Sequence, residues 1–359
     1  MSKKNLFWIW HVGSRSGYIP IGFPSQFDHA IGVLLIDGAD VGVLRSVVLP
    51  DGREAFCRTE QLCVAVWDTD RNIELFHTAC PFATSARRLD PKFAGWTLFG
   101  NGNCDYVLGE AHQVERIEVV RARSLDSLAS ERHSVIGMPS ILSIDAQGAS
   151  LSILLGASTV LDQHVDAIIC ETELIPFYGG TPSFSGTLEM LSAKGFLFSG
   201  FIEEATSWAS PCRMPVGTRS RTLQGSLDAM FIRDPQQLPE SLDPARATRY
   251  VIAACLLGHA DIAAAALMRV KEDFPESNDP TIVFARQLRD AVLEMPARFP
   301  PSFKEARLAK QRDERQPPAL MERDIIDTPF ESCLRDAGFT SLANQVRQFR
   351  TDQSAFATL

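Results

Sequence analysis

A glycine-rich turn and an acidic residue stand at the ends of two apolar runs near the start of the chain. The turn, Gly13 to Gly17, follows the apolar residues 6–11, and Asp37 ends the run that begins at residue 31. Glycine lets the backbone approach a ligand closely, and a carboxylate can accept hydrogen bonds from ribose hydroxyls. We therefore expect a site for a ligand with an adenosine portion. The alternative is an ordinary strand-to-loop turn for the glycines and a turn acid for Asp37.

Two more acidic residues, Asp145 and Glu173, each follow a later apolar run, and Tyr178 comes shortly after Glu173. Open parallel sheets bind ligands beyond the carboxyl ends of their strands, so both carboxyls should lie in one crevice. Group transfer to a hydroxyl needs aligned reactants and a base for the hydroxyl proton, and Asp145 is the first candidate for that base. The alternatives are a helix N-cap or a surface ion pair for each acid and core packing for Tyr178.

The histidines His11, His77 and His164 could each serve as a base on chemistry alone. Only His11 stands at a suitable place, because it ends the first predicted strand. It either contacts the bound ligand or packs in the core.

Short apolar runs bounded by turn residues predict the strands that position these groups. We expect strands at residues 6–11, 31–36, 62–67, 73–77, 117–121, 141–144, 167–170, 196–201 and 229–232. Helix-capable stretches separate several of them, at residues 127–130, 149–161 and 184–194. Alternation of this kind predicts a mostly parallel sheet covered by helices.

The character of the sequence changes at residue 234, where a Pro/Gln-rich stretch opens and strands cease. We expect one domain at residues 1–233 and a helical extension at residues 234–359. Asp243-Pro244 and Asp279-Pro280 each predict a helix start, with a third helix between them at residues 260–273. The turn near Gly258 is similar to that of a tetratricopeptide hairpin, although a plain helical subdomain is the alternative. The tail should form two short helices and fray from Ser354 onward.

Composition excludes several classes of function. The net charge of −9 disfavours nucleic acid as a partner, and eight scattered cysteines lack the spacing of a metal site. The apolar run near the start is too short for a membrane span, so we expect a cytoplasmic protein without a bound metal. The remaining partners are a small-molecule or glycan acceptor and, through the helical extension, a second copy of the chain or another protein.

The order of these segments over residues 6–233, about two thirds of the chain, resembles that of the FkbM-like methyltransferases. The most specific part is ILSIDAQGA at residues 141–149, followed by LGA at residues 155–157 and by ETELIPFYGGTPSF at residues 171–184. Weaker matches are VGSRSG at residues 12–17, ID at residues 36–37, SLDSL at residues 124–128 and LDAMFI at residues 227–232.

The resemblance implies a Rossmann-like class I methyltransferase sheet, mostly parallel with its last strand antiparallel, that binds S-adenosylmethionine. It implies O-methylation of a sugar, glycan or secondary-metabolite hydroxyl, as in polysaccharide biosynthesis. The implied donor-binding residues are Val12, Gly13, Ser14, Ser16, Gly17, Asp37, Asp126 and Asp145. The implied catalytic residues are Asp145, Glu173 and His11, and the implied acceptor-binding residues are Glu173 and Tyr178. Asp126 is also a candidate N-cap for the helix that follows it.

Three residues depart from the family pattern. His11 replaces a common aspartate, Ser143 stands where lysine is frequent, and Ser150 stands where glutamate is frequent. Ser143 and Ser150 favour an alternative, a non-catalytic methyltransferase-like module that binds a partner through its helical extension. The residues Gly13, Gly17, Asp37 and Asp145, which the chain retains, oppose this alternative. A nicotinamide-dependent oxidoreductase would share the sheet, but the first turn lacks Gly-x-Gly-x-x-Gly.

Overall fold

A computed structural model describes most of the chain and divides it into two compact units. The described residues are 7–13, 19–28, 30–38, 49, 58–100, 106–132, 136–180, 183–211, 223–295 and 327–357. The first unit comprises Met1–Phe23 and Asp28–Gln237, and the second comprises Pro24–Phe27 and Leu238–Leu359. The candidates Ser14, Ser16 and Gly17 lie outside the described residues.

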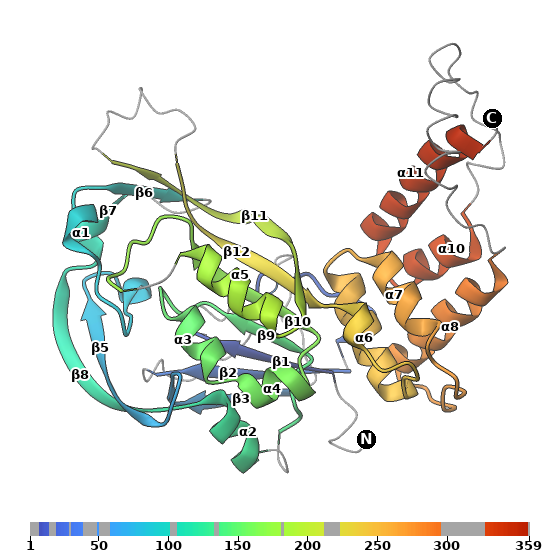
Figure 1. The fold of residues 1–359 in the computed structure, drawn as a ribbon, viewed down its shortest axis with the longest axis horizontal. Coiled ribbons are helices and arrows are strands. Elements are labelled where there is room, and N and C mark those ends of the chain that lie inside the picture. The colour runs from blue at the N-terminus through green and yellow to red at the C-terminus, as the bar shows by residue number, and fades with distance from the viewer. Residues whose placement is uncertain are drawn as a thin grey trace. The chain divides into compact units, whose positions relative to one another are not determined.

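The first unit is built on a nine-stranded sheet in the order β3-β2-β1-β9-β10-β12-β11-β6-β7 (Figure 1). Its parallel half consists of β3 (Arg58–Cys63), β2 (Ile31–Asp37), β1 (Phe7–Val12), β9 (Ile141–Ile144) and β10 (Ala167–Glu173). Antiparallel neighbours follow, namely β12 (Leu223–Arg233), β11 (Phe196–Ser210), β6 (Thr97–Gly100) and β7 (Tyr106–Val107). The predicted α/β architecture with a mostly parallel sheet is confirmed.

Helices cover this sheet and share its apolar core. They are α2 (Leu125–Arg132), α3 (Ser150–Leu155), α4 (Ser158–Gln163) and α5 (Phe184–Ala193). The single helix predicted at residues 149–161 is divided into α3 and α4. The break falls at Gly156, where an added Cβ would lie 2.1 Å from the carbonyl oxygen of Trp67. The close approach of another backbone therefore interrupts the helix.

Three predicted strands of the main sheet belong elsewhere, which corrects the sequence interpretation. Residues 62–67 are divided between β3 and β4 (Ala65–Val66), and β4 joins a separate sheet in the order β4-β8-β5. The long strands β5 (Arg71–Thr78) and β8 (Val114–Arg123) pair antiparallel and appear as the curved ribbon in Figure 1. Exposed residues along both strands show that neither is buried on both faces, as a central parallel strand would be.

An insertion between β5 and β8 extends the main sheet at its antiparallel edge. It contains two 3-10 turns, η3 (Pro81–Ala83) and η4 (Pro91–Phe93), the strands β6 and β7, and α1 (Leu108–Ala111). Its own small core joins Phe93 and Leu108 to Phe177 and Tyr178, which follow β10. The insertion thereby reaches the segment after β10.

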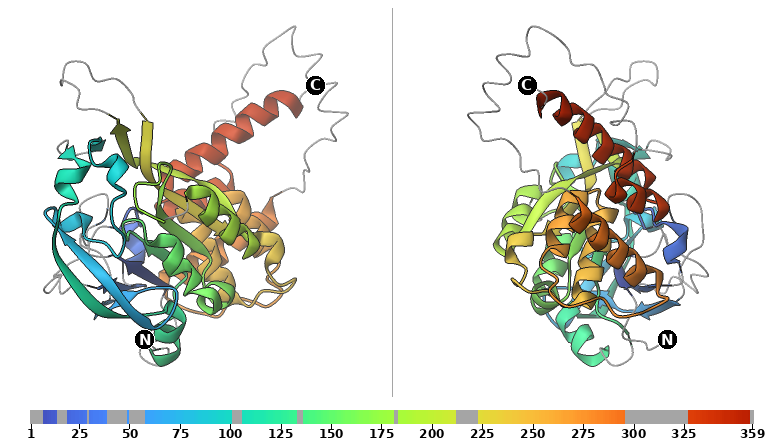
Figure 2. Two further views of the ribbon diagram at one scale, coloured as in Figure 1. Left: turned by 60° about the vertical axis from the view of Figure 1, so that its left-hand side comes forward. Right: turned by 90° about the vertical axis from the view of Figure 1, so that its right-hand side faces the viewer.

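The second unit is helical (Figure 2). Its helices are α6 (Pro244–Leu256), α7 (Ala260–Leu267), α8 (Pro280–Glu294), α10 (Pro329–Asp336) and α11 (Thr340–Ala357). The carboxylates of Asp243 and Asp279 accept hydrogen bonds from first-turn N–H groups of α6 and α8, as N-caps do. α7 ends at Leu267, six residues before the predicted end at residue 273. α11 is 18 residues long and ends at Ala357, past Ser354, where fraying was predicted to begin. No helix in the described part of the chain is long and apolar enough to cross a membrane.

A short segment from the beginning of the chain belongs to this helical unit. Phe27, in η2 (Ser25–Phe27), is completely buried, and its ring centroid lies 5.6 Å from that of Phe284 and 5.8 Å from that of Phe339. The aromatic core of the helical unit therefore includes a side chain that precedes it by more than two hundred residues.

Candidate functional site

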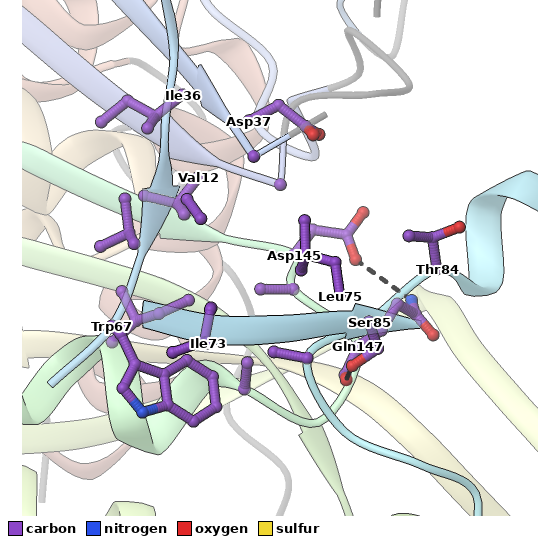
Figure 3. Close-up of a pocket in the computed structure, with 18 of the residues that line it drawn as sticks. Val12, Ile36, Asp37, Trp67, Ile73, Leu75, Thr84, Ser85, Asp145 and Gln147 are labelled. Carbon is purple, nitrogen blue, oxygen red and sulfur yellow. Dashed lines mark hydrogen bonds between the residues drawn. The ribbon is translucent and has the colours of Figure 1, made fainter. Parts of the chain in front are cut away.

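Three adjacent parallel strands end at one pocket. Gly13 follows β1, Asp37 is the last residue of β2, and Asp145 follows β9. Because these strands run in the same direction, their carboxyl ends meet at one edge of the sheet, and all three residues line the pocket with Val12 (Figure 3). The pocket holds about 830 Å³ of empty space when its open mouth is included.

Gly13 occupies a position that requires glycine. Its φ is +84°, and an added Cβ would lie 1.7 Å from the carbonyl oxygen of Asp145. The Gly13 N–H donates to the Ile36 carbonyl at 2.9 Å, and the Asp145 N–H donates to the Val12 carbonyl at 2.8 Å. The turn after β1 is therefore tied to both neighbouring strands, and its open face adjoins the pocket.

The pocket has an apolar end and an acidic end. Trp67 and Ile73 lie at the apolar end in Figure 3, whereas Asp37, Asp145 and Gln147 lie toward the opposite side. At its border Phe82, in η3, also lines the pocket with 66% of its surface exposed. A ligand with a flat apolar portion and a positively charged portion would complement this arrangement.

Burial perturbs the carboxyls at the acidic end. It raises the pKa of Asp145, and the nearby charge of Asp37 acts in the same direction. Burial also raises the pKa of Glu171 well above its usual value, and the charges of Asp145, Glu173 and Asp228 add to the effect. Burial raises the pKa values of Glu173 and Asp228 to about 7 in both cases. Closely spaced buried carboxyls of this kind favour a cationic partner.

Gln147 joins two of these carboxyls. Its Nε2 donates to Glu171 at 3.1 Å and 3.3 Å and, at 3.5 Å, to Asp145 Oδ1. The Tyr178 hydroxyl donates to Gln147 Oε1 at 2.7 Å. The next residue, Gly148, has a φ of +79°, and an added Cβ would lie 2.5 Å from the Tyr178 ring. The loop after β9 is thus fitted against Tyr178.

Two predicted site residues lie away from the pocket. His11 is completely buried within β1, its Nδ1 lies 2.9 Å from Ser143 Oγ, and burial lowers its pKa to about 4. Asp126 does not cap its own helix α2. Its carboxylate accepts hydrogen bonds from the N–H groups of Thr159 and Val160 at the start of α4, at 3.0 Å and 2.9 Å. Neither side chain is among those that line the pocket.

Glu173 and Tyr178 are buried and do not line the pocket either, but the Tyr178 hydroxyl donates to Gln147 and the charge of Glu173 acts on Glu171. Sequence reasoning missed Gln147 and Glu171, as well as the pocket residue Trp67. Glu171 precedes Glu173 by two residues and shares its strand face, which was an available signal. No local sequence signal identified Trp67, because its position depends on the pairing of β4 with β8 in the second sheet.

In the described ranges of the chain, no group of three histidine, cysteine, aspartate or glutamate side chains is arranged to hold a metal ion.

Residues 55–198 match the family model described as the methyltransferase FkbM domain. The matched range includes the loop after β9, all of β10 and the segment through Tyr178, and it begins after the strands β1 and β2. The resemblance found in the sequence is thereby confirmed: this part of the chain is similar to the methyltransferase FkbM domain. No curated protein and no solved structure is significantly similar to the chain.

Proposed function

We propose that this protein, which carries an FkbM methyltransferase domain over residues 55–198, methylates a hydroxyl of a sugar, glycan or secondary-metabolite acceptor with S-adenosylmethionine. The observation that carries the proposal is the convergence of Gly13, Asp37 and Asp145 on one pocket. These residues come from three separate segments of the sequence. Each ends a different strand of the parallel half of the sheet.

The residues present fit the methyl donor. Gly13 lines the pocket without a side chain, so the methionine portion could lie against the backbone of this turn. The Asp37 carboxylate is suited to accept hydrogen bonds from the ribose hydroxyls. The sulfonium and ammonium groups of the donor are positive, and the buried carboxyls near Asp145 would attract them in a medium of low dielectric constant.

When bound, the donor supplies a methyl group on a positively charged sulfur. Asp145 is the residue that we propose to receive the acceptor's hydroxyl proton, because burial makes its carboxylate more basic. Glu173 and Tyr178 would orient the acceptor from behind the loop that follows β9. We propose no catalytic role for His11, because its imidazole is buried and neutral and is hydrogen-bonded to Ser143.

The alternative of a non-catalytic module depended on the missing charges at Ser143 and Ser150. Ser143 faces His11 inside the sheet and does not line the pocket, so its lack of charge leaves the pocket intact. The described cysteines form no disulfide, which supports the reducing cytoplasm as the place of this reaction.

Calorimetric titration with S-adenosylmethionine and S-adenosylhomocysteine tests the proposal. We expect binding by the natural protein and its loss in Asp37→Ala. The matched control is Asp162→Ala, because Asp162 lies on α4, forms an ion pair with Lys194 and has a half-exposed side chain. Absence of heat with either compound, or equal loss of binding in both variants, would contradict the proposal. Heat with NAD alone would favour an oxidoreductase instead.

A further inference from the structure

Gln147 is the central member of a hydrogen-bond network that runs from the insertion to the pocket. Its side chain donates to Asp145 and Glu171 and accepts from Tyr178. Its backbone carbonyl accepts a hydrogen bond of 2.6 Å from the hydroxyl of Ser85, which also lines the pocket. Both ends of Gln147 are therefore held by other segments of the chain.

The orientation of the Gln147 amide follows from its partners. Tyr178 donates to Oε1, so the two N–H groups of the amide point to the carboxyls of Asp145 and Glu171. A flipped amide would place an oxygen against these carboxyl oxygens, which is unfavourable. On the far side, His112 Nε2 lies 3.2 Å from the Tyr178 hydroxyl oxygen, and His112 Nδ1 lies 3.0 Å from the Leu108 carbonyl. His112 of the insertion thus contacts the Tyr178 hydroxyl, and that hydroxyl orients the Gln147 amide.

The backbone of Gln147 is strained. Its φ is +41°, and within the described residues no other non-glycine side chain has a positive φ. Residues other than glycine rarely adopt a positive φ, because their side chains clash with the backbone there. Such strain is found preferentially at functional sites. The strained turn aims the Gln147 side chain toward the carboxyl of Asp145, as Figure 3 shows, and toward that of Glu171.

We propose that Gln147 is a positioning residue, whose amide holds the carboxyls of Asp145 and Glu171 together against the positive end of the methyl donor. The inference rests on the proposed function. The two carboxyls are also faced by Asp37 from β2, Glu173 from β10 and Asp228 from β12. Gln147 supplies amide hydrogen bonds within this acidic group, and they partly offset the repulsion among the carboxyls.

Loss of the amide should change how donor binding depends on pH. The side-chain amide of Gln147 lowers the pKa of Asp145, and the backbone N–H of Gln147 lowers that of Glu171, in both cases against the opposing effect of burial. In Gln147→Met the side chain keeps its length but donates nothing, so Asp145 should stay protonated up to a higher pH. In Gln147→Glu a further negative charge should move the titration of Asp145 higher still.

The experiment is calorimetric titration of the full chain with S-adenosylmethionine and S-adenosylhomocysteine across the neutral and alkaline pH range. At neutral pH we expect Gln147→Met to bind S-adenosylmethionine about tenfold more weakly, as for loss of a hydrogen bond to a charged group. Affinity should recover as the pH rises, and the pH of half-maximal affinity should increase from the natural protein to Gln147→Met to Gln147→Glu. S-Adenosylhomocysteine, whose sulfur is neutral, should show a smaller change. Tyr178→Phe should reproduce part of the Gln147→Met effect.

The control is Gln163→Met, the same chemical change at an exposed position at the end of α4. Its binding and its pH profile should match those of the natural protein. If Gln147→Met and Gln147→Glu weaken binding equally at every pH, Gln147 only packs, and the inference is overturned while the proposed function stands. If the natural protein binds neither compound at any pH, the proposed function itself fails.

Discussion

His11 on β1 and Ser143 on β9 are registered partners in adjacent parallel strands, and the His11 Nδ1 atom lies 2.9 Å from the Ser143 Oγ atom. At both positions this chain lacks the charge that its resemblance to FkbM-like proteins leads us to expect. Because the two side chains face each other in the sheet core, they form a neutral pair. These departures therefore concern the stability of the sheet rather than the pocket.

Ser143→Ala should destabilise the fold without weakening donor binding. The substitution leaves a buried imidazole nitrogen without its hydroxyl partner, which costs about 1–3 kcal/mol of unfolding free energy. Urea denaturation measures this loss, and calorimetry with S-adenosylhomocysteine measures the affinity. Ser192→Ala, at an exposed position of α5, is the control and should be neutral. A marked loss of affinity in Ser143→Ala would place this pair in the donor site.

His11 should make the protein sensitive to acid. Burial lowers its pKa from 6.5 to about 4, so the folded state binds fewer protons than the unfolded state between these values. The associated stability is present above pH 6.5 and is lost as the pH falls through about 4, by roughly 3 kcal/mol in all. In His11→Asn this part of the pH dependence should disappear, as measured by denaturation at a series of pH values. An unchanged acid profile would show that His11 is not held neutral.

Glu173→Gln should have the opposite pH signature. The pKa of Glu173 is about 7 in the folded protein, above its ordinary value of 4.5, so its stabilising effect is complete at low pH and is lost as the pH rises through 7. Above neutral pH the variant should therefore be more stable than the natural protein, by up to roughly 3 kcal/mol. Glu189→Gln, exposed on α5, is the matched control. A variant that is less stable at alkaline pH would show that the Glu173 carboxylate has a favourable partner.

Gly13→Ala should disrupt the turn after β1. The added methyl group would overlap the Asp145 carbonyl, and the positive φ is unfavourable for alanine. We expect a loss of at least about 2 kcal/mol in unfolding free energy and loss of donor binding. Gly22→Ala serves as the control, because an added Cβ there has no atom within 4 Å. Normal stability and affinity in Gly13→Ala would mean that the turn readily adopts another conformation.

Phe27→Ala should destabilise the helical unit. The side chain is completely buried between Phe284 and Phe339, and removal of such an aromatic group costs about 3–5 kcal/mol. Thermal unfolding of the full chain, followed by circular dichroism, should show a lower transition temperature. Phe82→Ala removes the same group from an exposed position and should leave the transition in place. Equal transitions in the two variants would contradict the assignment of Phe27 to this core.

The sequence was most informative where a short apolar run is buried on both faces. This pattern located β1, β2, β9 and β10, and with them the strand ends that carry Asp37 and Asp145. The Asp-Pro pairs located the starts of α6 and α8 for an equally local reason, since a cap and a first-turn proline act within a few residues.

The remaining features depend on contacts between distant residues. Residues of β5 and β8 read as buried strands, but their antiparallel pairing in a separate sheet depends on the insertion between them. Strand position alone placed His11 in the site, whereas the structure buries it against Ser143. Gln147 was missed because its importance comes from the strained turn and from Tyr178, which no local pattern reveals.

The assignment of Pro24–Phe27 to the helical unit limits how this protein can be divided. A fragment that begins at residue 238 would lack an aromatic side chain of its own core, and one that ends at residue 237 would carry Phe27 without Phe284 and Phe339. The helical unit therefore cannot be added or removed intact by a gene fusion at one junction, because it is formed from two separate parts of the chain. A polypeptide cut there should regain its fold only when both pieces are produced together.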